Sequence, residues 1–220
     1  MILTTKNLRK EVPSGETNLV ILDDITFNLE EGKSLAITGP SGSGKSTLLG
    51  LLAGLDTATS GDIVLDGIKL NLLNEEERAI LRKDKVGFVF QSFELLPSLT
   101  ALENVMLPSE LKSEENPKKK GEYFLERVGL SDRQNHYPNQ LSGGEQQRVA
   151  IARAFACSAK ILFADEPTGN LDQKNGKLIS DLLFEVNSET DNALVIVTHD
   201  QNLALQCDKK IELKLGKIVD

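Results

Sequence analysis

The chain has 220 residues, 40% of them hydrophobic and 26% charged, and it carries a formal net charge of −8 at pH 7. That length suits one globular domain with room for an inserted sub-domain, and the acidic balance argues against a nucleic-acid binder, which would carry a basic excess. No apolar run approaches the roughly 18 residues of a membrane-spanning helix, and the first residues, MILTTKNLRK, lack the apolar core of a signal peptide. We therefore expect a cytoplasmic protein without direct membrane insertion, in which Cys157 and Cys207 are reduced structural thiols.

The first part of the chain predicts β-structure that gives way to alternating strands and helices. Two strands, at Ile2–Leu8 and Leu19–Leu29, flank a turn that contains Pro13, Ser14 and Gly15. Shorter strands are expected at 33–38, 63–65 and 86–90, a buried helix at 47–55 and a surface helix at 75–83.

From Phe93 to about Lys160 the pattern is helical, and a charged stretch at 113–128 is expected to face solvent. The alternation then resumes with strands at 161–164 and 193–198, a helix at 176–187 and a final β-hairpin around Gly216. Strands that alternate with helices imply a parallel sheet. We therefore predict a single α/β domain, residues 1–220, with a β-rich edge and a helical sub-domain inserted at about 93–160.

A glycine-rich loop, GPSGSGKST, lies between a predicted strand and a predicted helix and satisfies the pattern G-x-x-x-x-G-K-[ST]. Its glycines let successive backbone N–H groups wrap phosphate oxygens, and the following helix N-terminus adds positive potential. We expect Lys45 to reach the β- and γ-phosphates, Ser46 to ligate Mg²⁺ and Thr47 to contact the α-phosphate. A glycine-rich turn without a ligand is the alternative, and the strand–loop–helix setting disfavours it. The predicted nucleotide contacts are Gly39, Pro40, Ser41, Gly42, Ser43, Gly44, Lys45, Ser46 and Thr47.

Two acidic residues, Asp165 and Glu166, directly follow the apolar strand predicted at 161–164. A strand end holds side chains rigidly, so Asp165 is suited to hold Mg²⁺ through its water shell. Because successive strand residues alternate in direction, Glu166 is expected to point the other way and to polarise an attacking water. Two surface carboxylates at the start of a loop would look the same in isolation, but a phosphate loop upstream favours the catalytic interpretation.

Gln91 and His199 follow two further predicted strands, VGFVF and LVIVT. The carboxyl ends of parallel strands form the ligand crevice of an open sheet. Gln91 is a candidate ligand of Mg²⁺ or sensor of the attacking water, and His199 could bond the γ-phosphate and hold Glu166 and water in line. Each alone could be an ordinary surface or core residue, but together with Lys45 and Glu166 they predict a hydrolytic site.

A second candidate anion-binding loop, LSGGE, opens an amphipathic helix. The Ser142 hydroxyl and the amides of Gly143 and Gly144 could bind a γ-phosphate, with Glu145 completing the loop. Because this loop belongs to the predicted helical insertion, we expect it to lie far from the phosphate loop of its own chain. The simplest solution is a head-to-tail homodimer in which each copy's loop closes over the nucleotide of the other.

Six motifs thus follow one another through the whole chain: GPSGSGKST, Gln91, LSGGE, ILFADE, NLD at Asn170–Asp172, and His199. In this order they resemble the nucleotide-binding subunit of ATP-binding cassette (ABC) transporters. The resemblance implies a P-loop NTPase fold with a RecA-like core, an antiparallel β sub-domain and an inserted α-helical sub-domain, and it implies ATP hydrolysis with ATP and Mg²⁺. The signature has Glu145 where many members have glutamine. The stretches VGFVFQSFELLPSLTALENVMLP and ADEPTGNLD resemble the lipoprotein-releasing and macrolide-export (LolD/MacB) type, with Ybb-type ATPases as the nearest relatives.

The same resemblance implies a separate integral membrane subunit, a permease, and so a peripheral location on the inner face of the bacterial cell membrane. Some relatives move substrates, whereas others drive cell-wall remodelling, and the cargo cannot be read from this sequence. In many members an aromatic residue near the end of the first strand stacks on adenine, but Val12 occupies that position here. Val12 supplies only apolar contact, which forgoes stacking of about 1–3 kcal/mol and leaves selectivity for ATP over GTP open.

The segment Gln91–Val105 is expected to contact the permease, because a partner helix could lie in a groove that the segment lines. Phe93 and Glu94 are the favoured contact residues, whereas Leu96 and Leu99 could equally be core residues of the helical sub-domain.

Three other classes of protein remain as alternatives. A P-loop kinase would need an acceptor pocket and an arginine-bearing lid, and it has no use for LSGGE. A non-hydrolysing nucleotide-gated scaffold is disfavoured by the presence of Lys45, Glu166 and His199. A soluble DNA-repair or ribosome-associated relative would carry long coiled-coil insertions or two cassettes in one chain.

Overall fold

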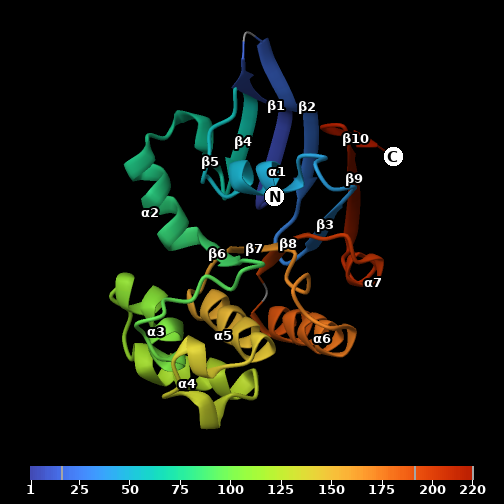
Figure 1. The fold of residues 1–220 in the computed structure, drawn as a ribbon. Coiled ribbons are helices and arrows are strands. Elements are labelled where there is room, and N and C mark those ends of the chain that lie inside the picture. Colours follow the sequence, from blue (N-terminus) through green and yellow to red (C-terminus); the bar gives the residue numbers. More distant parts are fainter. Residues whose placement is uncertain (16, 191, 220) are drawn as a thin grey trace. The chain divides into compact units, whose positions relative to one another are not determined.

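The computed structural model describes residues 1–15, 17–190 and 192–219 (Figure 1). The chain divides into two compact units: unit 1 comprises Met1–Arg82 and Ala193–Asp220, and unit 2 comprises Lys83–Asn192. Within the described ranges, none of the helices combines the length and the apolar character that a membrane crossing requires.

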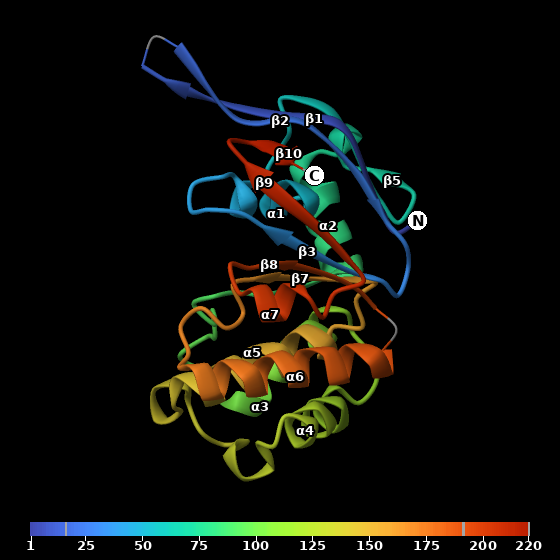
Figure 2. The same ribbon diagram turned by 90° about the vertical axis from the view of Figure 1, so that its right-hand side faces the viewer.

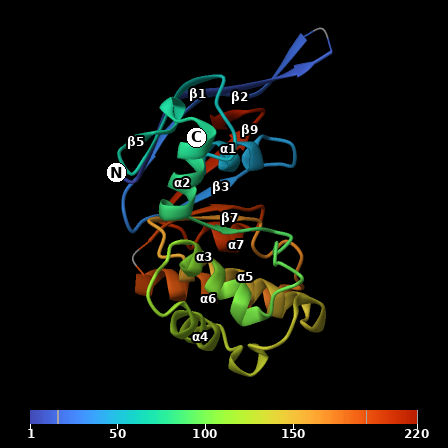
Figure 3. The same ribbon diagram turned by 90° about the vertical axis from the view of Figure 1, so that its left-hand side faces the viewer.

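Unit 1 opens with a long antiparallel hairpin of β1 (Leu3–Ser14) and β2 (Thr17–Leu29), whose tip projects beyond the rest of the unit (Figures 2 and 3). The two strands run further toward the turn than the sequence predicts. Beyond Arg9, β1 pairs only with β2, so Pro13 lies on an edge strand where its missing N–H removes no second partner. β4 (Ser60–Leu65) pairs with β1 and β5 (Ile68–Lys69) with β4, which gives the order β2-β1-β4-β5.

The second sheet of unit 1 is built around β3 (Ser34–Thr38), which is buried along its whole length. β3 pairs in parallel with β8 (Ala193–Val197) on one side and β9 (Lys209–Lys214) on the other, and β10 (Lys217–Val219) pairs antiparallel with β9. The predicted parallel strands and the C-terminal hairpin are therefore confirmed.

In the described part of the chain, three helices and a 3₁₀ turn belong wholly or mainly to unit 1. α1 begins and ends earlier than the predicted helix at 47–55, because Gly54 adopts a left-handed conformation (φ 70°) and ends it. α2 buries only Leu81, as expected of a surface helix. The bounds are α1 (Lys45–Leu52), η1 (Leu70–Leu72), α2 (Glu75–Lys85) and α7 (Gln201–Ala204).

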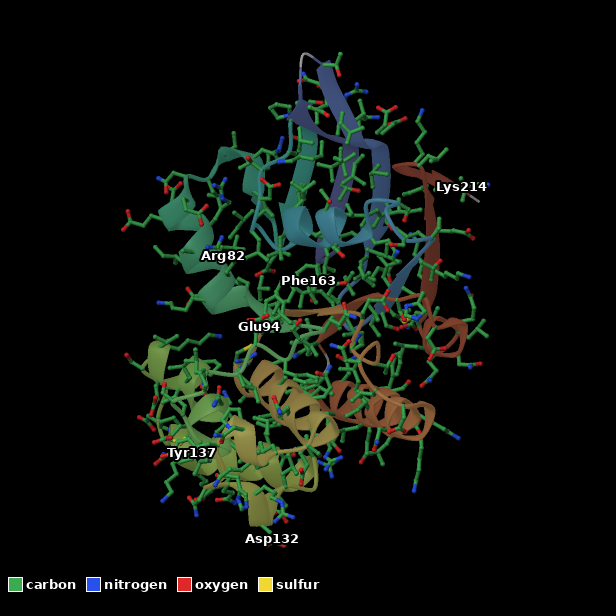
Figure 4. All side chains as sticks on the ribbon, viewed as in Figure 1. Arg82, Glu94, Asp132, Tyr137, Phe163 and Lys214 are labelled. Atoms are coloured by element: carbon green, nitrogen blue, oxygen red, sulfur yellow. The ribbon has the colours of Figure 1, made fainter. Side chains whose placement is uncertain are left out.

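Unit 2 contains the parallel pair β6 (Val86–Val89) and β7 (Ile161–Asp165). Phe163 on β7 is fully buried, and its ring centroid lies 5.9 Å from that of Phe88 on β6 (Figure 4). Around this pair gather α3 (Ala101–Leu111), α4 (Pro117–Arg127), η2 (Ser131–Arg133), η3 (Pro138–Gln140), α5 (Gly143–Ala156) and α6 (Gln173–Thr190).

α5 is the central helix of unit 2 and packs against α3, α4, α6 and β6. Its buried face includes Val149, Ala152 and Ala156, so the predicted amphipathic helix is confirmed. The helical stretch predicted at about 93–160 lies within unit 2, and its extent as a separate sub-domain stays a prediction.

The expectation that residues 113–128 face solvent is wrong for one face of α4. Ser113 and Asn116 are left-handed, so the helix begins only at Pro117, and it then buries Phe124 and Leu125. The hydrophobic effect explains the difference, because α4 carries enough apolar surface to pack on α3 and α5 despite its many charges.

Candidate active site

The phosphate loop (Gly39–Thr47) joins β3 to α1 in unit 1. Gly39 has a φ of 141°, and a Cβ there would lie 2.1 Å from the Leu213 carbonyl oxygen. Gly44 has a φ of 98°, and its Cβ would lie 2.8 Å from Leu22 Cδ2. Both positions therefore require glycine.

The donors of this loop are arranged for an anion. Gly44 offers no capping side chain to α1, and the first turn of α1 has no acidic residue. Lys45 Nζ donates to the carbonyl oxygens of Gly39 (2.9 Å) and Pro40 (3.0 Å). Ser43 Oγ is buried and has no hydrogen-bond partner in the described part of the chain. A phosphate group would give these N–H, ammonium and hydroxyl donors the acceptors they require.

Unit 1 also brings His199 to the start of the phosphate loop. Ile37 on β3 is in register with Val197 on β8, and the Thr198 N–H donates to the Ile37 carbonyl at 3.1 Å. The two strands therefore end side by side, which places the exposed His199 beside Gly39. Residues that follow the carboxyl ends of neighbouring parallel strands generally lie close together.

The predicted adenine contact, Val12, lies on the β1–β2 hairpin, half-buried and paired with Leu19. The same hairpin reaches the phosphate loop, because a Cβ on Gly44 would contact Ile21 Cγ2 at 3.6 Å. Val12 and the phosphate loop are thus carried by elements that contact each other within unit 1.

Unit 2 brings Gln91 and Glu166 together. Val89 on β6 is in register with Ala164 on β7, so both residues follow strands that end at the same level. A Cβ added to Gly169 would lie 3.0 Å from Gln91 Nε2 and 3.3 Å from Glu166 Cβ. Both side chains therefore lie against Gly169, and Asp165, the last residue of β7, precedes Glu166 directly.

The prediction that strand alternation sets the direction of Glu166 is wrong. β7 ends at Asp165, and Glu166 is left-handed with a φ of 46°, so strand alternation does not apply to it. A left-handed turn, closed by the Gly169 N–H donating to the Glu166 carbonyl at 2.9 Å, sets its direction instead. The role predicted for Glu166 does not depend on that argument and stays a prediction.

The signature loop (Ser142–Glu145) opens α5 with a capping box. The Ser142 N–H and hydroxyl both donate to Glu145 Oε2 at 2.8 Å, and the Glu145 N–H donates to Ser142 Oγ at 3.3 Å. Arg133 Nε donates to the other carboxylate oxygen at 3.1 Å. Hydrogen bonds from Ser142, helped by Arg133, lower the pKa of Glu145 from 4.5 to about 2, so this carboxylate is ionised at neutral pH.

A hollow of about 500 Å³ adjoins the signature loop, and all of its lining belongs to unit 2. Arg148 and Asn175 are not among the predicted site residues, although each follows a motif residue by three positions, the spacing at which helical side chains are neighbours. Asn175 donates to Asp172 through its backbone N–H (3.0 Å) and Nδ2 (2.6 Å), which lowers the pKa of Asp172. The lining residues are Ser142, Gly143, Gly144, Glu145, Arg148, Asn170, Leu171, Asp172 and Asn175.

The segment between β6 and α3 is partly exposed, and Glu94, labelled in Figure 4, is one of its exposed residues. Phe93 is half-buried and approaches the signature loop, because a Cβ on Gly143 would lie 3.8 Å from Phe93 Cζ. Leu96 is 44% exposed, whereas Leu99 is half-buried. The buried Asn104 fixes both leucines by donating from Nδ2 to their carbonyl oxygens at 3.1 Å.

Comparison with known proteins decides the family. A profile of the family described as "ABC transporter" matches residues 22–169, which span the phosphate loop, Gln91, the signature loop and the acidic pair. The chain belongs to the ABC transporter family.

Relatives of this ATP-binding cassette resemble it over nearly their whole length. It is 50% identical over 219 residues to the uncharacterized ABC transporter ATP-binding protein YbbA of Escherichia coli (strain K12), covering 99% of this chain and 96% of YbbA. It is 46% identical over 219 residues to the lipoprotein-releasing system ATP-binding protein LolD of Treponema denticola, covering 99% of this chain and 97% of LolD.

Among solved structures, the cassette resembles the ATP-binding cassette MJ0796, described in a dimeric post-hydrolysis state bound to ADP and Pi. The TM-score is 0.91 at 45% identity, and the match covers 99% of this chain and 97% of MJ0796. The predictions of an ABC cassette fold and of the LolD/MacB-like, Ybb-type subfamily are therefore confirmed. This chain is an ATP-binding cassette of a family that hydrolyses ATP.

Proposed function

We propose that this cassette is the ATPase subunit of a membrane ABC complex and that two copies close head to tail around two ATP molecules. Each copy contributes its phosphate loop to one nucleotide and its signature loop to the other. Lys45 holds the β- and γ-phosphates, Glu166 polarises the attacking water, and His199 holds the γ-phosphate in line with both.

The hollow beside the signature loop carries this proposal. Its lining combines the signature loop with Arg148, a cation, and Asn175, an amide, beside the carboxylates of Glu145 and Asp172. A second set of phosphate-binding groups, separate from the first, is what a shared site requires of each copy. The dimeric structures described for MJ0796, which is 45% identical, support a dimer of cassettes.

Mg²⁺ fits the residues predicted to hold it. Ser46, Gln91 and Asp165 would offer hydroxyl, amide and carboxylate oxygens, the hard donors that Mg²⁺ prefers, and Mg²⁺ commonly takes its remaining ligands from phosphates and water. When bound, the ion neutralises charge that develops on the transferred phosphoryl group. Asp165 and Gln91 then orient that ion, while Lys45 and the loop amides orient the phosphates.

The membrane subunit is proposed to dock on the segment Gln91–Val105, with Glu94 and Phe93 among the contacts. Glu94 is exposed, so a partner can contact it directly. The half-buried Phe93 lies beside the signature loop, so a shift of Phe93 on docking would also move that loop. This docking places the cassette peripherally on the inner face of the bacterial cell membrane. The relation to LolD, named as part of a lipoprotein-releasing system, supports a membrane partner.

Glu166→Gln tests the shared site. The variant should bind ATP and Mg²⁺ without turnover and shift from monomer to dimer in light scattering, because both half-sites stay intact while the water is not activated. Adding Ser142→Arg to this variant should abolish the dimer and leave ATP binding to the monomer unchanged, since residue 142 serves the partner's nucleotide.

Three outcomes would count against the proposal. Glu166→Gln could remain monomeric at saturating ATP, or Ser142→Arg could destroy ATP binding to the monomer, which would assign the signature loop to its own site. Wild-type monomers, held apart by immobilisation at low density, could hydrolyse ATP at the full rate of the free protein.

A further inference from the structure

Phe93 and Glu94 are two consecutive left-handed residues, with φ values of 63° and 49°. This conformation is unfavourable for residues with a Cβ, and two in succession persist only when their surroundings hold them. They lie two and three positions after Gln91, the predicted Mg²⁺ ligand at the end of β6. Whatever holds them therefore also limits where Gln91 can lie.

Arg153 holds both residues. It projects from α5, and its guanidinium donates through Nη2 to the Phe93 carbonyl at 2.9 Å and through Nη1 to the Glu94 carbonyl at 2.6 Å. The rigid fork of a guanidinium can reach two adjacent carbonyl oxygens at once, which a lysine ammonium on its flexible stem does not reproduce. Arg153 is half-buried, so these carbonyls replace water that the charge has lost.

Gln91 is fixed from the other side by Asn170. Asn170 Nδ2 donates to the Gln91 carbonyl at 2.8 Å, and Gln91 Nε2 donates to Asn170 Oδ1 at 3.4 Å. Asn170 follows Gly169, whose missing side chain leaves room for the Gln91 amide next to Glu166. The backbone bond is the shorter of the two, so the Gln91 side chain can leave Asn170 while its backbone stays in place.

We propose that Arg153 is a positioning residue for Gln91. By holding Phe93 and Glu94 in the left-handed conformation, it keeps the Gln91 backbone against Asn170 and so presents the Gln91 side chain where Glu166 and Asp165 lie. This inference rests on the proposed function, in which Gln91 is a Mg²⁺ ligand.

A purely structural role for Arg153 makes a different prediction. If Arg153 only supported the packing of α5, no substitution at residue 94 would compensate for its loss. If it acts by holding left-handed backbone, replacing Glu94 with glycine should compensate, because glycine adopts positive φ without the steric penalty. The double variant Arg153→Lys with Glu94→Gly, compared with Glu94→Gly alone, separates the two roles.

The first measurement is hydrogen exchange in the nucleotide-free, full-length protein. In Arg153→Lys, amides of residues 92–96 should exchange roughly tenfold faster, since two charge-assisted bonds are lost. Exchange in α6 should not change. Arg127→Lys is the matched control, because Arg127 is another arginine of unit 2 whose guanidinium bonds Glu185 and Glu189 on α6 rather than the segment after Gln91.

The second measurement is the dependence of ATP hydrolysis on Mg²⁺. Arg153→Lys should raise the Mg²⁺ concentration for half-maximal rate roughly five- to tenfold with little change in the KM for ATP, and Glu94→Gly should restore most of the loss. Unchanged exchange at 92–96, or a defect that Glu94→Gly leaves untouched, would overturn the inference. Gln91→Ala separates failure of this inference from failure of the proposed function. If Gln91→Ala leaves the Mg²⁺ dependence unchanged, the metal role in the proposed function is wrong. If Gln91→Ala changes the Mg²⁺ dependence and Arg153→Lys does not, only the role of Arg153 is overturned.

Discussion

Glu145→Gln measures how much the ionised carboxylate stabilises the start of α5. A pKa that falls from 4.5 in the unfolded chain to about 2 corresponds to an upper limit of about 3 kcal/mol in the free energy of unfolding at neutral pH. The side chains of Arg133 and Glu145 are 45% and 20% exposed, so solvent screening reduces this to about 1–2 kcal/mol. In a chain of this length, that loss lowers the Tm by roughly 2–8 °C.

The stabilisation by the Glu145 carboxylate should depend on pH in a defined direction. Because the pKa of Glu145 is lower in the folded protein, its contribution is fully present above about pH 4.5 and is lost as the pH falls toward 2. Glutamine keeps an oxygen that can accept from the Ser142 N–H and hydroxyl but carries no charge for Arg133. Calorimetric Tm values of wild type and variant should therefore differ at pH 7 and converge near pH 2.

α3 supplies a matched control for the capping box. Thr100 and Glu103 form the same box with the same distances of 2.8, 2.8 and 3.3 Å, and hydrogen bonds from Thr100 alone lower the pKa of Glu103. Glu103→Gln should therefore lower the Tm less than Glu145→Gln, and the difference reports the share of Arg133. Equal losses, or a loss that persists unchanged at pH 2, would refute this account of the charge.

Four further substitutions, one of them a control, test other parts of the cassette. Val12→Tyr should tighten ATP binding roughly five- to 150-fold in calorimetric titrations if the base lies at this position, because a ring adds stacking of about 1–3 kcal/mol; an unchanged Kd would place the base elsewhere. Gly39→Ala should abolish ATP binding and lower the Tm, since its Cβ would lie 2.1 Å from the Leu213 carbonyl, whereas Gly50→Ala on α1, with nothing within 4 Å, should be stabilising by about 0.5–1 kcal/mol in thermal unfolding. Asp208→Asn should be destabilising above about pH 4 and neutral near pH 2, because hydrogen bonds from Ser34 lower the pKa of Asp208 to about 2, and Tm values across this range check it.

The loops of the candidate site could be predicted because their chemistry is local in sequence. A phosphate loop needs its glycines, lysine and hydroxyls at fixed spacings, so nine consecutive residues are enough to predict it. The structure agrees, because it requires glycine at both Gly39 and Gly44. Within unit 2, the closeness of Gln91 and Glu166 could be predicted from strand ends alone, since β6 and β7 are parallel and in register. Within unit 1, the same reasoning applies to His199 and Gly39, which follow the paired strands β8 and β3. The start of α5 was predicted near this loop, because LSGGE was interpreted as the opening of an amphipathic helix. Its capping box between Ser142 and Glu145 was not predicted and is seen only in the structure.

The backbone conformations inside these loops could not be predicted. Phe93, Glu94 and Glu166 belong to residue types that rarely adopt positive φ, and none of them is preceded by a local signal for it. The first two are held by Arg153, about sixty positions later in the chain. A contact between residues so distant in sequence leaves no periodicity or spacing to detect, so only the folded structure reveals it.

Because Glu166 is left-handed, the direction of this candidate base is set by contacts with a helix rather than by strand β7. The turn that follows it brings the Pro167 carbonyl to Gln147 Nε2 on α5, a buried bond of 2.6 Å, while the Gly169 N–H closes back onto Glu166. α5 starts with the signature loop, so the helix that carries Ser142, which we propose to bind a partner's nucleotide, also holds the turn that sets the direction of Glu166. Glycine or asparagine would adopt this conformation at lower cost, by about 1 kcal/mol. A glutamate at 166 therefore does not serve the stability of the fold, which agrees with the role that we propose for its carboxylate.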